Sequence, residues 1–93
     1  MSAGAFQPRR FMSKSIRSPR HHCLLKVLID ARSKAGMTQF ALAERVGRPQ
    51  SYVAKYENGE RRLDVIEFVE LVEAIGDEPK KVFARFLSAS KIA

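Results

Sequence analysis

The chain has 93 residues, of which 45% are hydrophobic and 29% charged, a composition typical of one small globular domain with a modest core. It has no run of about 18 apolar residues, so we expect no membrane-spanning helix. Its single cysteine excludes an internal disulfide and favours a cytoplasmic location. The sequence has no Gly-rich phosphate loop, metal-ligand cluster or nucleophile–base pair, so we expect no enzymatic activity, no cofactor and no metal site.

The net charge is +7 and is unevenly distributed along the chain. Residues 1–22 carry a charge of +5 and residues 23–63 a charge of +4, whereas residues 64–93 carry −2. Such a gradient would orient the molecule toward a polyanion and make its binding sensitive to salt. On charge alone, a solvated basic surface explains the composition as well as nucleic-acid binding does.

Residues 1–17 combine Gly, Pro, three Ser and four cations without an apolar period, which predicts a disordered basic arm, either unbound or in contact with nucleic acid. The folded domain is expected over residues 18–88, and residues 89–93 are expected to fray. Ser18 and Pro19 form an N-cap and first-turn pair, and Gly36 is a stop signal. These signals predict a first helix over residues 19–34.

The central stretch, residues 37–59, reads as two short helices joined by a tight turn at Gly47. The first is expected over residues 38–46, with Thr38 as its N-cap. The second is expected over residues 49–57, with Pro49 in its first turn and an apolar stripe of only Val53 and Tyr56. A helix that buries so little, and presents amides, hydroxyls and cations elsewhere, suits insertion into the major groove of DNA.

Nine residues of this stretch agree in register with one known motif: Thr38, Gln39, Leu42, Ala43, Gly47, Gln50, Val53, Glu57 and Gly59. The motif resembles the helix-turn-helix of phage Cro and repressor proteins, the XRE family, and the resemblance extends from about Leu24 to Leu87. It implies an all-α fold, a compact five-helix, lambda-repressor-like bundle with the helix-turn-helix at its second and third helices.

Four side chains of the second motif helix are expected to reach DNA bases. Gln50 can make a bidentate contact with adenine, and Lys55 can donate to guanine. Ser51 is short and could serve a base or a phosphate. Tyr52 could place its ring on a thymine methyl or a sugar, or donate its hydroxyl to a phosphate.

Cations and an amide next to that helix are expected to bind phosphates. Arg48 lies in the turn before it, and Arg61 and Arg62 lie in the loop after it, where they could reach the DNA backbone or the minor groove. The resemblance implies that Asn58, at the end of the helix, also donates to a phosphate.

The resemblance further implies two structural roles inside the motif. Gln39 would bind a phosphate and brace Gln50. Glu57 would pair with Arg32 of the first helix as a structural tie, with no contact to DNA. Phe40 departs from the family, in which small or polar residues are common at that position. We expect it to pack back on the first helix, and the alternative is an exposed position near the DNA backbone.

Asp64 and Glu67 form a capping box that starts another helix, which Gly76 ends. Its expected core face holds Val65, Phe68, Val69, Leu71, Val72 and Ile75. Glu67, Glu70 and Glu73 follow one another at three-residue steps and are interpreted as a solvated face.

A last helix is expected over residues 79–88, with an apolar stripe at Val82, Phe83, Phe86 and Leu87. Part of that stripe would pack on the first helix. The remainder makes Phe83, Phe86 and Leu87 candidates for a homodimer surface.

The leading hypothesis is a sequence-specific regulator of transcription, most simply a repressor, that binds double-stranded DNA as a dimer on an inverted repeat. It would act in the cytoplasm, on the nucleoid. A second hypothesis is the DNA-binding antitoxin of a toxin–antitoxin pair, which also binds a toxin. A third is a protein-binding adaptor on the same scaffold, against which the amides and cations of the motif argue.

Overall fold

The computed structural model describes residues 18–91, and the expected arm (residues 1–17) and the last two residues lie outside this part. All regular structure in the described part is helical: α2 (Pro19–Lys34), α3 (Gln39–Val46), α4 (Gln50–Glu57), α5 (Val65–Ile75) and α6 (Pro79–Ser90). The expected all-α bundle of five helices is therefore confirmed. None of these helices is long and apolar enough to cross a membrane.

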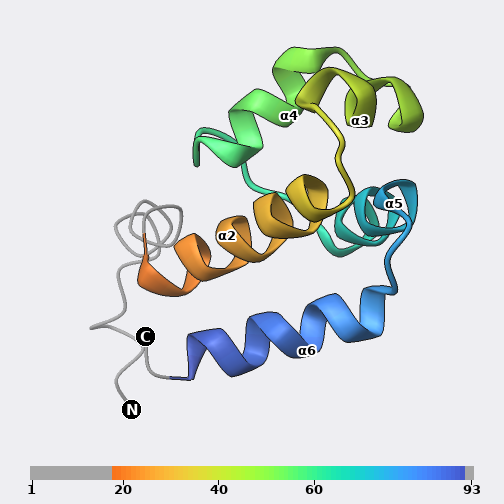
Figure 1. The fold of residues 1–93 in the computed structure, drawn as a ribbon. Coiled ribbons are helices and arrows are strands. Elements are labelled where there is room, and N and C mark those ends of the chain that lie inside the picture. The colour runs from red at the N-terminus through yellow and green to blue at the C-terminus, as the bar shows by residue number, and fades with distance from the viewer. Residues whose placement is uncertain (1–17, 92–93) are drawn as a thin grey trace.

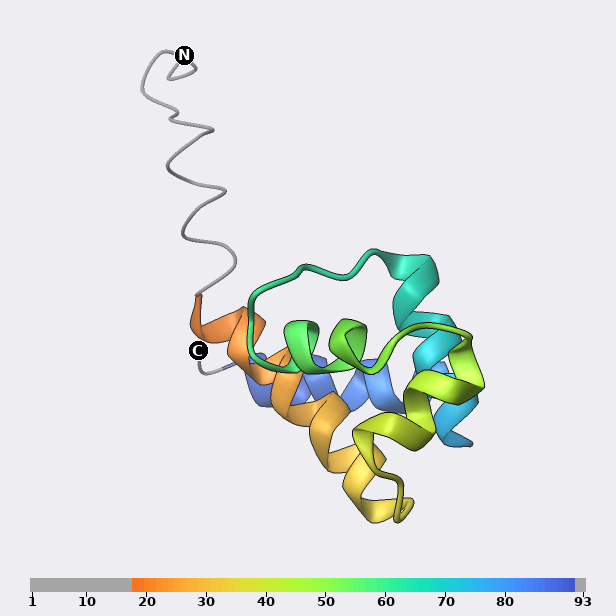
Figure 2. The ribbon, with the colours of Figure 1, turned by 90° about the horizontal axis from the view of Figure 1, so that it is seen from above.

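The helices form three levels (Figure 1). The pair α3 and α4 lies on one side of the molecule, α6 lies on the opposite side, and α2 and α5 lie between them. In the view from above, α4 lies in front of α6 (Figure 2). Helices α2 and α6 run in opposite directions and diverge from one end, where the start of α2 lies beside the end of α6 (Figures 1 and 2). At this meeting point, the Cys23 thiol lies 3.7 Å from the Ala89 carbonyl oxygen, to which it can donate.

The helix ends follow the signals read from the sequence. Ser18 and Thr38 are N-caps whose hydroxyls accept the backbone N–H three residues on, at 3.1 and 3.0 Å. Gly47 ends α3 with φ at 71°, a left-handed conformation that glycine adopts without steric cost. Asp64 and Glu67 form the predicted capping box at the start of α5.

Two boundaries differ from the prediction. Pro49 is the N-cap of α4 and not its first helical residue: its backbone is extended, and its carbonyl accepts the N–H of Tyr52 at 3.0 Å. Helix α6 runs to Ser90, so residues 89 and 90 are helical and not frayed. Ser90 is buried, and its hydroxyl donates to the Leu87 carbonyl, which explains why the last turn persists.

All five helices contribute to one core. Its buried hydrophobic residues are Leu25, Leu28, Ala31, Leu42, Ala43, Tyr52, Val53, Tyr56, Leu71, Val72, Ile75 and Val82. Two predicted packing positions are wrong. Val65 is 74% exposed, because it is the first residue of α5 and the buried residues of this helix lie in its later turns. Phe40 is 58% exposed and does not pack into the core against α2.

Candidate nucleic-acid interface

Helix α4 has one buried side and one side open to solvent. Val53 and Tyr56 are completely buried beneath it. Gln50, Ser51 and Lys55 are exposed. Three of the four side chains expected to read bases are therefore accessible on one short helix. The buried Val53 and Tyr56 fix the rotation of this helix about its axis, so that the three side chains face solvent.

Tyr52 requires a correction. It was expected to contact a base, but only 8% of it is exposed, and its ring packs edge to face on Tyr56 with 5.8 Å between centroids. The guanidinium carbons of Arg48 and Arg61 lie over the ring at 4.5 and 4.8 Å from its centroid. Burial, followed by the charge of Glu67, raises the pKa of its hydroxyl. The ring thus belongs to the support of α4 and not to its exposed face.

A chain of hydrogen bonds runs from α2 to the first residue of α4. Arg32 donates twice to Glu57, from Nε to Oε2 at 2.7 Å and from Nη2 to Oε1 at 3.0 Å. Gln39 donates from its amide nitrogen to Glu57 Oε1 at 2.8 Å, and Gln50 donates to Gln39 Oε1 at 3.2 Å. The structure thus contains the tie between Arg32 and Glu57 and the contact between Gln39 and Gln50 that the resemblance implied.

The carboxylate of Glu57 sets the direction of every bond in this chain. An ionised carboxylate only accepts, so Gln39 must turn its amide nitrogen toward Glu57 and its carbonyl oxygen toward Gln50. Gln50 must then donate to Gln39, which leaves it one amide hydrogen and its carbonyl oxygen. Adenine offers an acceptor at N7 and a donor at N6 in the major groove, which matches this remaining pair of groups.

Two arginines lie on either side of α4 along the chain, and both reach Glu67 of α5. Arg61 makes two hydrogen bonds with the Glu67 carboxylate, at 2.9 and 3.1 Å, and Arg48 Nη2 lies 3.7 Å from Glu67 Oε2. The hydrogen bond from Arg61, followed by the backbone N–H of Asp64, lowers the pKa of Glu67. Its side chain is only 12% exposed, so the interpretation of Glu67 as part of a solvated face is wrong.

The other residues expected at phosphates lie near the end of α4. Asn58 is exposed, with its amide 3.5 Å from the Glu60 carboxylate. Arg62 is exposed and lies close enough to His21 that its charge, after burial, lowers the pKa of that imidazole. Within residues 18–91, no three His, Cys, Asp or Glu side chains gather as metal ligands do.

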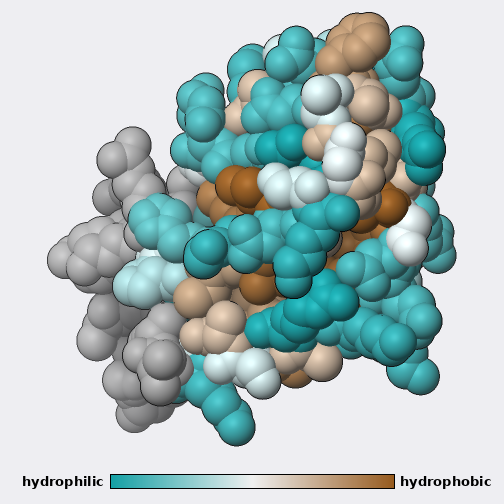
Figure 3. Space-filling view, in the orientation of Figure 1, coloured by the Kyte–Doolittle hydropathy of each residue, from teal (hydrophilic) through white to brown (hydrophobic). Residues whose placement is uncertain are grey.

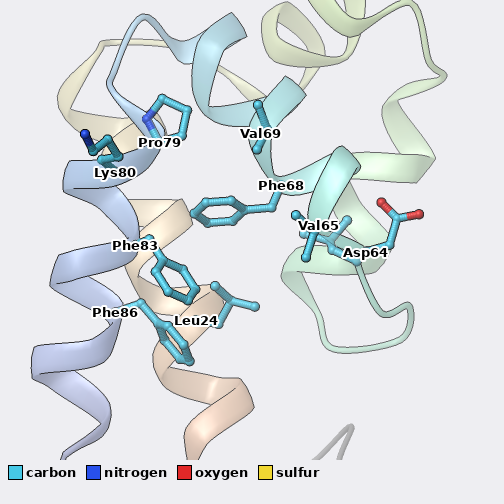
Figure 4. A pocket seen from close by; sticks show the side chains of 10 residues that line it. Leu24, Asp64, Val65, Phe68, Val69, Pro79, Lys80, Phe83 and Phe86 are labelled. Carbon is cyan, nitrogen blue, oxygen red and sulfur yellow. The ribbon is translucent and has the colours of Figure 1, made fainter.

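An apolar groove lies between α2, α5 and α6, and no residue of α4 lines it (Figure 4). Three rings follow one another along it: Phe68 and Phe83 are 6.0 Å apart, and Phe83 and Phe86 are 5.6 Å apart. Asp64 and Lys80 lie on opposite sides of the groove, whose volume is about 370 Å³. The space-filling view, drawn from the same side as Figure 1, shows hydrophobic residues at the surface between hydrophilic ones (Figure 3).

Two comparisons with known proteins point to the same family. The family model described as helix-turn-helix matches residues 28–79, which is more than half of the chain. A solved XRE-family like protein from Pseudomonas syringae pv. tomato is 47% identical over 85% of this chain and 96% of its own, with a TM-score of 0.75. The clp gene regulator ClgR from C. glutamicum is 18% identical over 82% of this chain and 99% of its own, with a TM-score of 0.72, a likeness of fold. A search of curated proteins found no significant match.

Proposed function

This chain belongs to the XRE family of helix-turn-helix DNA-binding transcription regulators, and from that premise we propose that it is a sequence-specific repressor. It binds double-stranded DNA as a homodimer on an inverted repeat, with α4 of each subunit in the major groove. It acts in the cytoplasm, on the nucleoid, and has no enzymatic activity.

The observation that carries this proposal is the orientation of Gln50. A hydrogen-bond chain anchored at the nearly buried Glu57 holds its amide, on the open side of α4, with a donor and an acceptor left for a base. Ser51 and Lys55 are exposed beside it. Gln50 would read adenine, Lys55 would read guanine, and Ser51 would contact a base or a phosphate.

Phosphate contacts would set the position of α4 on the duplex. Gln39 lies in the first turn of α3, where backbone N–H groups and the helix dipole attract anions. Arg48 and Arg61 lie on either side of α4 along the chain, and Asn58 and Arg62 lie just beyond it. The positive charge of residues 23–63 and the negative charge of residues 64–93 support this orientation toward DNA.

The dimer is proposed to form at the apolar groove between α2, α5 and α6, with a second copy of this chain as its occupant. Helix α6 carries apolar side chains that the core of the domain does not cover: Phe83 and Leu87 are exposed and Phe86 is half-buried. A two-fold axis brings each patch against its own copy. Lys80 and Asp64 on opposite sides of the groove would then face Asp64 and Lys80 of the partner, which makes the groove complementary in charge to itself.

One observation also supports an antitoxin role. Ile66 adds exposed apolar surface at the start of α5, outside the groove, which a toxin could cover. The adaptor hypothesis is weaker, because a protein that does not bind DNA would not need Gln50 held on the open side of α4 with a donor and an acceptor left over.

The test is selection of random duplex DNA by the purified protein, repeated over a salt series. We expect an enriched inverted repeat with half-sites about one helical turn apart, and affinity that falls steeply as salt rises. Binding without an enriched sequence would contradict sequence-specific recognition. An absence of binding at low salt would reject the DNA-binding proposal and favour a protein partner.

A further inference from the structure

We propose that Glu67 and Tyr52 are positioning residues that hold Arg48 ready for one DNA phosphate, with Arg61 as part of the support. We call Arg48, Tyr52, Arg61 and Glu67 the arginine cradle. The inference rests on the proposed function, because it specifies how the DNA-binding face keeps its cations in place.

The cradle joins four separate segments around α4. Arg48 comes from the turn before the helix, Tyr52 from the helix itself, Arg61 from the loop after it, and Glu67 from the first turn of α5. Both guanidinium groups lie within 5 Å of the centroid of the same tyrosine ring and within 4 Å of the same carboxylate. Planar guanidinium groups stack well on aromatic rings and pair well with carboxylates.

The two arginines are not equivalent within the cradle. Arg61 uses Nη1 to donate to Glu67 Oε1 and to the Arg62 carbonyl, and Nη2 to donate to Glu67 Oε2. The Tyr52 ring and the charge of Glu67 hold Arg48 in place. The distance from Arg48 Nη2 to Glu67 Oε2 is 3.7 Å, which is too long for a hydrogen bond. Arg48 therefore keeps its donors for a phosphate, whereas most of those of Arg61 are already used.

The cradle explains why an acid belongs near a surface that binds an anion. Two neighbouring guanidinium groups repel each other, and one carboxylate between them leaves a net charge of +1 facing outward. An arginine held in place also loses less conformational freedom when it meets a phosphate than a mobile one does. Glu67 thus strengthens binding through position although its own charge opposes it.

The substitution Glu67→Gln separates the effect of charge from that of position, because the two predict opposite changes in DNA affinity. The substitution makes the protein more positive, so charge alone predicts tighter binding to DNA. Loss of position predicts weaker binding to the selected site. Glutamine still suits the third position of a capping box, so the start of α5 is preserved.

The matched control is Glu70→Gln. Glu70 is exposed on the same helix and is close enough that its charge raises the pKa of Tyr52. It forms no ion pair with other residues of the described part, so its substitution changes the charge and leaves the cradle intact.

The experiment measures fluorescence anisotropy of the selected duplex and of a scrambled duplex of equal length, at several salt concentrations. We expect Glu67→Gln to bind the selected duplex about tenfold more weakly than the wild type, the effect of one weakened charge-assisted hydrogen bond. Glu70→Gln should bind both duplexes at least as well as the wild type, whereas Glu67→Gln should also bind the scrambled duplex more weakly, because a phosphate contact does not depend on sequence. Equal behaviour of the two variants would overturn the inference. Failure of the wild type to bind either duplex at low salt would instead reject the proposed function, and this inference with it.

Two further variants test the role of the Tyr52 ring, and a measurement without DNA tests whether Arg48 is held in place. Tyr52→Phe keeps the aromatic face and should bind like the wild type, whereas Tyr52→Leu should bind like Glu67→Gln. In the absence of DNA, nitrogen relaxation of the Arg48 Nε–H group should report a rigid side chain in the wild type and a mobile one in Glu67→Gln. An Arg48 side chain that is already mobile in the wild type would contradict the inference without reference to DNA.

Discussion

Arg32 and Glu57 join α2 to the end of α4 through two hydrogen bonds of 2.7 and 3.0 Å, with only 14% and 5% of their side chains exposed. The hydrogen bond with Glu57 raises the pKa of the guanidinium, so Arg32 stays charged. The same carboxylate accepts the amide of Gln39, which in turn orients Gln50. One ion pair therefore ties the domain together and anchors the group proposed to read DNA.

Breaking this pair should destabilise the fold. Arg32→Ala leaves a nearly buried carboxylate without its cation, which we expect to cost about 3 kcal/mol in the free energy of unfolding. Urea denaturation of Arg32→Ala, Glu57→Ala and the double variant measures it. The double variant should lose less than the two single losses together, by at least about 1 kcal/mol. Strictly additive losses would show that the two side chains do not interact.

Gln39 should matter for DNA binding more than for stability. Gln39→Ala removes the bond that orients Gln50, so affinity for the selected site should fall about tenfold, with only a small change in melting temperature. Gln39→Glu should be worse, because a carboxylate there cannot donate to Glu57 and would repel it. Binding and thermal melting of both variants test this order. An affinity of Gln39→Glu equal to that of the wild type would contradict the proposed direction of the chain.

Acid should weaken the fold partly through Glu67 and Asp77. Arg61 and then the Asp64 N–H hold the pKa of Glu67 below the ordinary value of a glutamate. The Glu78 N–H and then Arg85 hold the pKa of Asp77 below the ordinary value of an aspartate. A lowered folded-state pKa gives stability that is fully present above the ordinary value and is lost as pH falls through the folded value. Melting temperatures measured from about pH 5 to about pH 2 should fall less steeply for Glu67→Gln than for the wild type. Parallel curves would show that Glu67 contributes nothing to the acid response.

The groove between α2, α5 and α6 should control the oligomeric state. Phe83→Asp places a charge among its aromatic rings, so sedimentation equilibrium should show monomers where the wild type forms dimers. Affinity for the inverted repeat should fall about 100-fold through lost avidity, with affinity for one half-site unchanged. Phe40→Asp makes the same substitution at an exposed site outside the groove and should leave the dimer intact. A wild type that is monomeric at all concentrations, or a dimer that Phe83→Asp does not weaken, would contradict the proposed interface.

Local sequence signals predicted the helices well. Ser18, Thr38 and Asp64 are caps whose short polar side chains satisfy backbone groups within three residues, so no distant partner is needed to identify them. The tie between Arg32 and Glu57 spans 25 positions and could be expected only because the motif resembles a known family.

The sequence could not predict the arginine cradle. Tyr52 precedes the buried Val53 and lies four residues before the buried Tyr56, a spacing that indicates its burial in retrospect. The polar character of its hydroxyl and its place in the motif favoured a DNA contact instead. Glu67 was recognised as a capping residue, but its pairing with Arg61 depends on how the loop after α4 folds back onto α5. Such contacts are set by tertiary packing and leave no local pattern.

The most direct test of the account is a comparison of the wild type and Gln50→Ala on the selected duplex and on all its single base-pair variants. We predict that the wild type loses about 1–3 kcal/mol at one symmetric position in each half-site, and that Gln50→Ala binds every base pair there equally well. Both proteins should keep the same preferences elsewhere in the site. A Gln50→Ala profile that matches the wild type at every position would contradict the reading of DNA by the first residue of α4.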